Sequence, residues 1–186
     1  MVGQPGSGKT TLARALASSL ASLSSQPVLV VDSQRVSTFA SEPHVSPREA
    51  VAALWPARGP RRSAIVHPRD ASEVEALMRA VRAGGDVVVL VDEAHHWTRA
   101  GASVELLRLL RGARHARATV LLTTQHLSGD VPAAALSCTA MVYVFRCASP
   151  RALDVLEREW GLDRRQVQRL PRFRYLTLRI GFDTER

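Results

Sequence analysis

The chain has 186 residues, a length that suits one α/β domain and is too short for two. Its two cysteines do not make a disulfide scaffold, and its longest uncharged and largely apolar stretch, residues 131–145, is shorter than the roughly 20 residues that cross a bilayer. We therefore expect a single domain, residues 1–186, of an intracellular protein with no membrane span.

The net charge of +8 suits a polyanionic partner such as DNA or RNA, because arginines that face phosphates release condensed counterions on binding. A GC-rich genome would produce a similar composition, and the chain has no asparagine and a single lysine. The charge alone therefore leaves both explanations open. The one lysine is informative because it is Lys9, where a phosphate-binding loop needs a flexible ammonium group.

The chain opens with a complete P-loop pattern, which is a glycine, four further residues and then Gly-Lys-Thr. The glycines permit backbone angles that turn N–H groups toward an anion, Lys9 would reach the β and γ phosphates, and the Thr10 hydroxyl would ligate Mg²⁺. Leucines at helical spacing predict a helix that follows directly and ends near Ser24. We expect ATP to bind at Gly3, Gln4, Pro5, Gly6, Ser7, Gly8, Lys9, Thr10 and Thr11.

The P-loop starts unusually early in the chain. Such a loop normally follows a buried central strand of about five residues, and Met1 and Val2 are too few to form it. Either the true N-terminus is missing or another segment takes that place in the sheet. We expect a missing start.

Strands and helices alternate along the rest of the chain, which predicts a mostly parallel sheet with helices on both faces. Residues 33–63 carry several prolines and no long period, so we expect an irregular excursion there. Its basic stretch, residues 58–62, could contact nucleic acid or be solvated. The expected strands are residues 28–31, 65–66, 86–91, 119–123, 141–145 and 173–180, and the expected helices are residues 70–83, 104–111 and 150–160.

The strand at residues 86–91 is an apolar, β-branched run that ends in Asp92 and Glu93, which resembles a Walker B motif. Asp92 would hold Mg²⁺ through its water shell. Glu93 would orient and deprotonate the water that attacks the γ-phosphate. Acids at both positions predict hydrolysis rather than a passive nucleotide switch.

The strand at residues 119–123 is followed by Thr124 and Gln125. An amide at a strand end beside the P-loop can contact the γ-phosphate or its attacking water. Gln125 is therefore a candidate sensor of the nucleotide, and the alternative is an exposed polar residue that starts a loop.

Together these motifs resemble the HerA/FtsK superfamily of RecA-like P-loop ATPases, and within it the genome-packaging ATPases of tailless, membrane-containing viruses. The resemblance implies a ring, commonly a hexamer, that uses ATP and Mg²⁺ to pull double-stranded DNA through its centre. It rests on the P-loop, on residues 87–93 with Ala94-His95-His96, on residues 121–125, and on residues 142–146 with the following Ser149-Pro150.

The resemblance also implies that an arginine from a neighbouring subunit completes each ATP site. Its distance before the strand at residues 119–123 points to Arg114, with Arg117 as the second candidate. The alternative is that both arginines are merely solvated at a helix end.

The small size favours viral packaging, with a capsid or portal vertex as partner, in the host cytoplasm or associated with the virion. Cellular or plasmid DNA-transfer ATPases are the first alternative. A small P-loop kinase is the second, and it would need a lid and an acceptor site. Asp92 to His95 also spell the DEAH box of helicases, which require two RecA-like domains. Glu93 and Gln125 together disfavour an adaptor that binds nucleotide without hydrolysing it.

Overall fold

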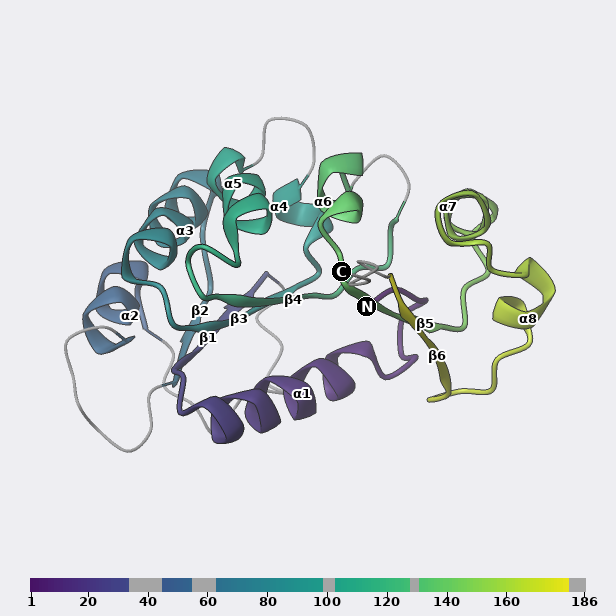
Figure 1. Cartoon of the computed structure of the whole chain (residues 1–186), viewed down its shortest axis with the longest axis horizontal. Coiled ribbons are helices and arrows are strands. Elements are labelled where there is room, and N and C mark those ends of the chain that lie inside the picture. Colours follow the sequence, from purple (N-terminus) through teal and green to yellow (C-terminus); the bar gives the residue numbers. More distant parts are fainter. Residues whose placement is uncertain (34–44, 55–62, 99–102, 128–130, 181–186) are drawn as a thin grey trace, which may run out of the picture.

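The computed structural model describes residues 1–33, 45–54, 63–98, 103–127 and 131–180. Its main sheet has four parallel strands in the order β2-β1-β3-β4 (Figure 1). These strands are β1 (Val28–Asp32), β2 (Ser63–Val66), β3 (Val88–Asp92) and β4 (Thr119–Leu122). The prediction of an α/β fold with a mostly parallel sheet is therefore confirmed. Because the strands share one direction, their carboxyl ends meet at one edge, where Asp32 pairs with Asp92.

Helices cover both faces of this sheet, as the alternating pattern predicts (Figure 1). Helix α1 packs on one face, where Ala13 contacts a layer that includes Val30 and Leu90. The neighbouring residues Val31 and Val91 point to the opposite face, which α2, α3 and α5 cover. Burial on both faces explains why the strands are continuous apolar runs. The helices are α1 (Lys9–Ser24), α2 (Pro47–Leu54), α3 (Ala71–Gly84) and α5 (Val104–Gly112).

Helix α2 contradicts the prediction that residues 33–63 form an irregular excursion. The helix begins with a reciprocal cap in which Ser46 Oγ accepts from Glu49 N at 3.3 Å and the Glu49 carboxylate accepts from Ser46 N at 2.8 Å. A proline at the first helical position reinforces this start. The sequence contains this capping pattern, with Ser46 three residues before Glu49. The surrounding prolines nevertheless favoured an irregular segment over a helix of only eight residues. The basic stretch, residues 58–62, lies outside the described residues.

A second, two-stranded antiparallel sheet follows, made of β5 (Met141–Phe145) and β6 (Tyr175–Arg179). Alternate residues of β6 are exposed, as the sequence pattern predicts, and Leu176 and Leu178 turn toward α7 (Pro150–Trp160). The short helices α4 (His95–Thr98), α6 (Ala133–Ser137) and α8 (Arg164–Gln168) were not predicted because four or five residues show no helical period. In the ranges that the structure describes, no helix is long and apolar enough to cross a membrane.

Two strands begin later than predicted because a residue near each expected start has a positive φ. Asp86 has φ 49°, and β3 begins at Val88; Phe173 has φ 66°, and β6 begins at Tyr175. Left-handed backbone does not continue a β-ladder, so these residues belong to the preceding turns.

Val2 joins the two sheets. It forms parallel bridges to Thr124, just after β4, and to Val144 in β5. Val2 N donates to Tyr143 O at 2.9 Å, and Phe145 N donates to Val2 O at 2.8 Å. One residue therefore occupies the place in which a full strand normally precedes a P-loop. The prediction that a longer strand is missing stays a prediction.

Candidate active site

The P-loop backbone is shaped to receive an anion. Gly6 and Gly8 have φ of 69° and 101°, a region that glycine adopts without steric cost. The loop is attached to the residue that follows β5, because Gln4 N donates to Arg146 O at 2.9 Å. Ser7 Oγ is buried and has no hydrogen-bond partner in the structure. A buried hydroxyl is costly without a partner, so its position at the cradle fits a bound phosphate oxygen.

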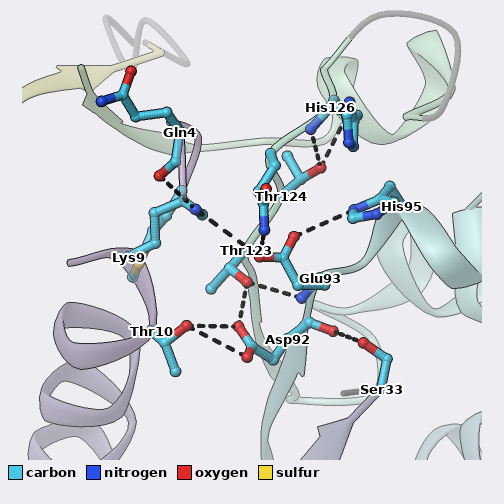
Figure 2. A network of polar contacts seen from close by, with 12 residues as sticks. Gln4, Lys9, Thr10, Ser33, Asp92, Glu93, His95, Thr123, Thr124 and His126 are labelled. Atoms are coloured by element: carbon cyan, nitrogen blue, oxygen red, sulfur yellow. Dashed lines mark hydrogen bonds and ion pairs between the residues drawn. The ribbon is translucent and has the colours of Figure 1, made fainter. Parts of the chain in front are cut away.

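Lys9 is buried at the start of α1 with its ammonium group inside the site. Its Nζ donates to Gln4 O at 3.2 Å and lies 3.9 Å from Glu93 Oε1 (Figure 2). Burial lowers the pKa of Lys9, while the nearby charges of Glu93 and Asp92 act in the opposite direction. A desolvated ammonium that is only partly compensated is a strong site for the negative charge of a polyphosphate.

Thr10 and Asp92 face each other across α1 and β3. The Thr10 hydroxyl donates to Asp92 Oδ1 at 3.1 Å, and Thr123 Oγ1 also donates to Asp92 Oδ1 (Figure 2). Burial raises the pKa of Asp92, and these two hydrogen bonds lower it in part. The predicted Mg²⁺ residues are thus adjacent.

A hydroxyl and a carboxylate are the hard oxygen ligands that Mg²⁺ prefers, and this ion commonly completes its shell with substrate phosphates and water. The described residues contain no group of three or more His, Cys, Asp or Glu side chains that could hold a metal by themselves. The residues present therefore fit an ion that enters together with a nucleotide, held by Thr10 and Asp92.

Glu93 follows β3 in a left-handed conformation, with φ 49°. Its N–H donates to Thr123 Oγ1 at 2.9 Å. Its carboxylate accepts from Gln125 Nε2 at 2.6 Å through Oε1. The other oxygen, Oε2, lies 3.3 Å from His95 Nδ1 (Figure 2). The structure thus brings Lys9, Glu93 and Gln125 together, as the strand-end positions predict, with the Gln125 amide on the carboxylate of Glu93.

The sequence reasoning missed two residues of this site. Thr123 is fully buried and holds both Asp92 and the backbone of Glu93. His95 packs near His126, with ring centroids 4.8 Å apart, and approaches Oε2 of Glu93, the carboxylate oxygen that Gln125 does not contact. A polar residue at the end of an apolar strand, two residues before Gln125, was the feature of the sequence that could have identified Thr123 as part of the site.

Arg114 lies at the other end of the sheet. It precedes β4, and its neighbour Ala116 accepts from Asp86 N at 3.0 Å, near the amino end of β3. The P-loop and Asp92 lie at the carboxyl ends, so Arg114 does not belong to the site of its own chain. Arg117 is engaged locally, because its guanidinium binds Asp86 with two hydrogen bonds, one of them 2.8 Å from Nε to Oδ1. Whether Arg114 or Arg117 reaches a neighbouring subunit stays a prediction.

Asp92→Asn is expected to raise the melting temperature of the nucleotide-free protein. Burial raises the pKa of Asp92, so ionisation is costly in the folded state. An acid whose pKa is raised by folding is protonated in both states when the pH is below 3.8, its ordinary pKa, so the cost is then absent. The cost is complete when the pH is above the pKa that the group has in the folded protein. The gain should therefore appear at pH 7 and vanish toward pH 4. If the gain is about 1 kcal/mol, calorimetry should show a rise of roughly 2–4 °C.

The matched control for that measurement is Asp86→Asn, which removes an exposed carboxylate that pairs with Arg117. It should not raise the melting temperature, since exposed ion pairs contribute only about 0–1 kcal/mol. A lower melting temperature for Asp92→Asn than for the unaltered protein would contradict the assigned cost of burying this carboxylate.

Comparison with known proteins supports the P-loop assignment. A family model described as an AAA domain matches residues 1–129. No curated protein matches the sequence. Among solved structures, the genome-packaging NTPase B204 of Sulfolobus turreted icosahedral virus 2 in complex with AMPPCP superposes with a TM-score of 0.79 at 18% identity, over 96% of this chain and 90% of that chain.

Two further structures of B204 agree with this likeness. The complex with ATP-gammaS gives a TM-score of 0.76 at 16% identity, over 96% of this chain and 90% of that chain. The crystal structure described as the DNA-packaging ATPase from Sulfolobus turreted icosahedral virus gives 0.74 at 16% identity, with the same coverage of 96% and 90%. At this identity the likeness shows a shared fold.

Proposed function

Because the chain belongs to the AAA domain family and has the fold of a P-loop NTPase, we propose that it is an ATP-driven translocase that packages double-stranded DNA into a viral capsid. The observation that carries the enzymatic part is the convergence of Lys9, Glu93 and Gln125 on one point beside the P-loop. The DNA part is supported by the net charge of +8 and by the fold shared with a protein described as a packaging NTPase.

Each residue of the site has a distinct role in hydrolysis. The P-loop N–H groups and Lys9 would bind the β and γ phosphates, and Thr10 and Asp92 would hold a Mg²⁺ ion, whose chemistry is to neutralise negative charge on the phosphates. Glu93 accepts a proton from the attacking water at its carboxylate, which the buried position of the side chain keeps away from bulk solvent. Gln125 orients this carboxylate through the 2.6 Å hydrogen bond to Oε1.

We propose further that the active form is a homo-oligomeric ring, most simply a hexamer, of the HerA/FtsK kind. Arg114 would reach from one subunit to the γ-phosphate held by the next, where it would stabilise charge in the transition state. Its place at the end of the sheet opposite the P-loop supports a role at a neighbouring site. The ring would work in the host cytoplasm and dock on a capsid or portal vertex.

A cellular or plasmid DNA-transfer ATPase would use the same site, so it remains the alternative within the same class. A small P-loop kinase is a different class, and it would protect its phosphoryl group from water until an acceptor binds. The contact of Glu93 with Gln125 and Lys9 supports water activation instead. Steady release of phosphate from ATP without an acceptor would exclude the kinase.

We expect DNA binding to be independent of sequence and to weaken as salt rises, because a translocating ring grips phosphates that repeat along any duplex. The logarithm of the binding constant should fall linearly with that of the salt concentration, with a slope of about −0.9 per phosphate contact. Fluorescence anisotropy on unrelated duplexes at several salt concentrations measures this.

Lys9→Ala is the matched control for this measurement. It should keep the DNA affinity and the salt slope, and it should lose DNA-stimulated phosphate release, since the change affects only the nucleotide site. A strong preference for one sequence, or an affinity that does not respond to salt, would contradict the translocase.

A further inference from the structure

The turn that precedes β6 lies directly on the P-loop. Arg174 N donates to Pro171 O at 3.1 Å to close the turn, and Arg172 Nε donates to Gly6 O at 3.4 Å. A Cβ placed on Gly8 would lie only 3.1 Å from Phe173 Cδ1 and 3.9 Å from Phe173 Cα. Residues separated by more than 160 positions in the sequence therefore meet at the phosphate cradle, beside the start of α1 (Figure 1).

Phe173 is unusual in both exposure and backbone. The residue is 59% exposed although it carries a large aromatic group, and its φ of 66° is rare for a bulky residue. An exposed apolar ring on strained backbone contributes little to folding. Such an arrangement persists where the surrounding structure holds it in place, and it is often found at ligand sites.

The ring of Phe173 lies against the guanidinium group of the preceding residue. The guanidinium carbon of Arg172 lies 4.7 Å from the Phe173 ring centroid, a cation–π distance. A second aromatic residue, Phe145, also borders Gly8, and its ring contacts that of Tyr175 with centroids 5.2 Å apart. Phe173 thus presents an exposed aromatic ring at the side of the cradle.

A nucleoside triphosphate needs such a surface. The P-loop would bind the phosphates. The base, which is joined to them through the ribose, would lie outside the phosphate cradle, where its flat π-system can stack on a neighbouring side chain. Among the exposed large apolar side chains in the described part of the chain, only Phe173 and Tyr175 are aromatic. Phe173 is the one that borders a P-loop glycine within 4 Å.

We propose that Phe173 is the platform on which the base of the bound nucleotide stacks, and that Arg172 holds the platform against the P-loop. The proposal rests on the proposed nucleotide function of the same site. Stacking does not read hydrogen-bonding groups, so purine nucleotides should bind with similar affinities, and better than pyrimidine nucleotides, whose smaller rings stack less strongly.

The test compares a ligand that has a base with one that has none. Calorimetry with Mg²⁺ would measure AMPPCP, which is not hydrolysed, and inorganic tripolyphosphate, which offers the phosphates alone. Phe173→Ala should weaken AMPPCP binding about 10-fold and leave tripolyphosphate binding within about 2-fold, since one lost stacking contact corresponds to roughly that factor. Leu23→Ala, which removes an exposed apolar side chain near the far end of α1, should change neither affinity.

Phe173→Trp keeps the proposal testable if the alanine variant does not fold. This variant should bind AMPPCP at least as tightly as the unaltered protein. Its additional tryptophan fluorescence should be quenched by AMPPCP and not by tripolyphosphate. Quenching by both ligands, or by neither, would overturn the proposal.

Two outcomes for Phe173→Ala would also overturn it. Unchanged AMPPCP affinity would mean that the ring does not contact the base. Equal weakening of both ligands would mean that the ring only supports the P-loop. Failure of the proposed function is recognised separately, because it appears in the unaltered protein as the absence of nucleotide binding or of phosphate release.

Discussion

Replacing Glu93 by glutamine is expected to leave nucleotide binding intact and to lower ATP turnover by roughly 10²- to 10⁴-fold, the range typical of a missing general base. Glutamine has the same shape and can still accept a hydrogen bond from Gln125, but it cannot accept a proton from water. The loss should therefore appear in kcat with little change in the dissociation constant of AMPPCP. Phosphate release and calorimetry on the same preparation measure both quantities.

Two further variants serve as controls for this result, one expected to lose nucleotide binding and one expected to keep full turnover. Lys9→Ala should abolish nucleotide binding or nearly so, because it removes a phosphate contact that is made in the ground state as well as in the transition state. Glu73→Gln makes the same chemical change at a surface residue that accepts a hydrogen bond from Arg69 N, and it should keep full turnover. If Glu93→Gln hydrolysed ATP at the unaltered rate, the assignment of Glu93 as the base would be wrong.

Arg114→Ala is expected to lower turnover by about 10³- to 10⁵-fold even in fully assembled rings, the range observed when an arginine finger is missing. The arginine acts on the neighbour, so two inactive proteins should rescue each other. Mixing Lys9→Ala subunits with Arg114→Ala subunits places, at some interfaces, an intact P-loop beside an intact arginine. With random equal mixing this occurs at roughly a quarter of the interfaces, and partial ATPase activity should return if sites fire independently.

Arg117→Ala is the matched control for this experiment. It removes an arginine from the same segment, one that is bound to Asp86 of its own chain, and it should retain turnover. Rescue must be measured in rings shown to contain both variants, for example by mass spectrometry of the intact assembly. A monomer that hydrolyses ATP alone would contradict the role of Arg114. The same conclusion would follow if Arg117→Ala were inactive alone and recovered activity when mixed with Lys9→Ala.

The sequence predicted well what depends on neighbouring residues and on the shared direction of the strands. The P-loop is contiguous, and Asp92 and Glu93 follow a strand whose buried character is visible as an apolar run. That Gln125 would lie near Glu93 follows because parallel strands end at one edge. The roles assigned to these residues stay predictions, but the proximity is present in the structure.

What escaped prediction depends on contacts between distant parts of the chain. Thr123 matters because its register beside Asp92 directs one hydroxyl at two residues of another strand. Phe173 was included in the closing strand because it fits an alternating pattern, and only its positive φ and its contact with Gly8 place it in a turn on the P-loop. A pattern along one segment carries no information about which other segment that segment will touch.

The connection through Val2 has a mechanical consequence. Gly3 N donates to Thr124 O, just beyond β4, and Gln4 N donates to Arg146 O, just beyond β5. Adjacent amides of the loop that would bind the phosphates are therefore attached to the ends of strands in two different sheets. A displacement of this loop would therefore act on both hydrogen bonds, and so on both sheets, at the same time. Strain produced at the phosphates would thereby reach the segment that carries Gln125 and the β5–β6 unit in the same movement, with no intervening element to absorb it.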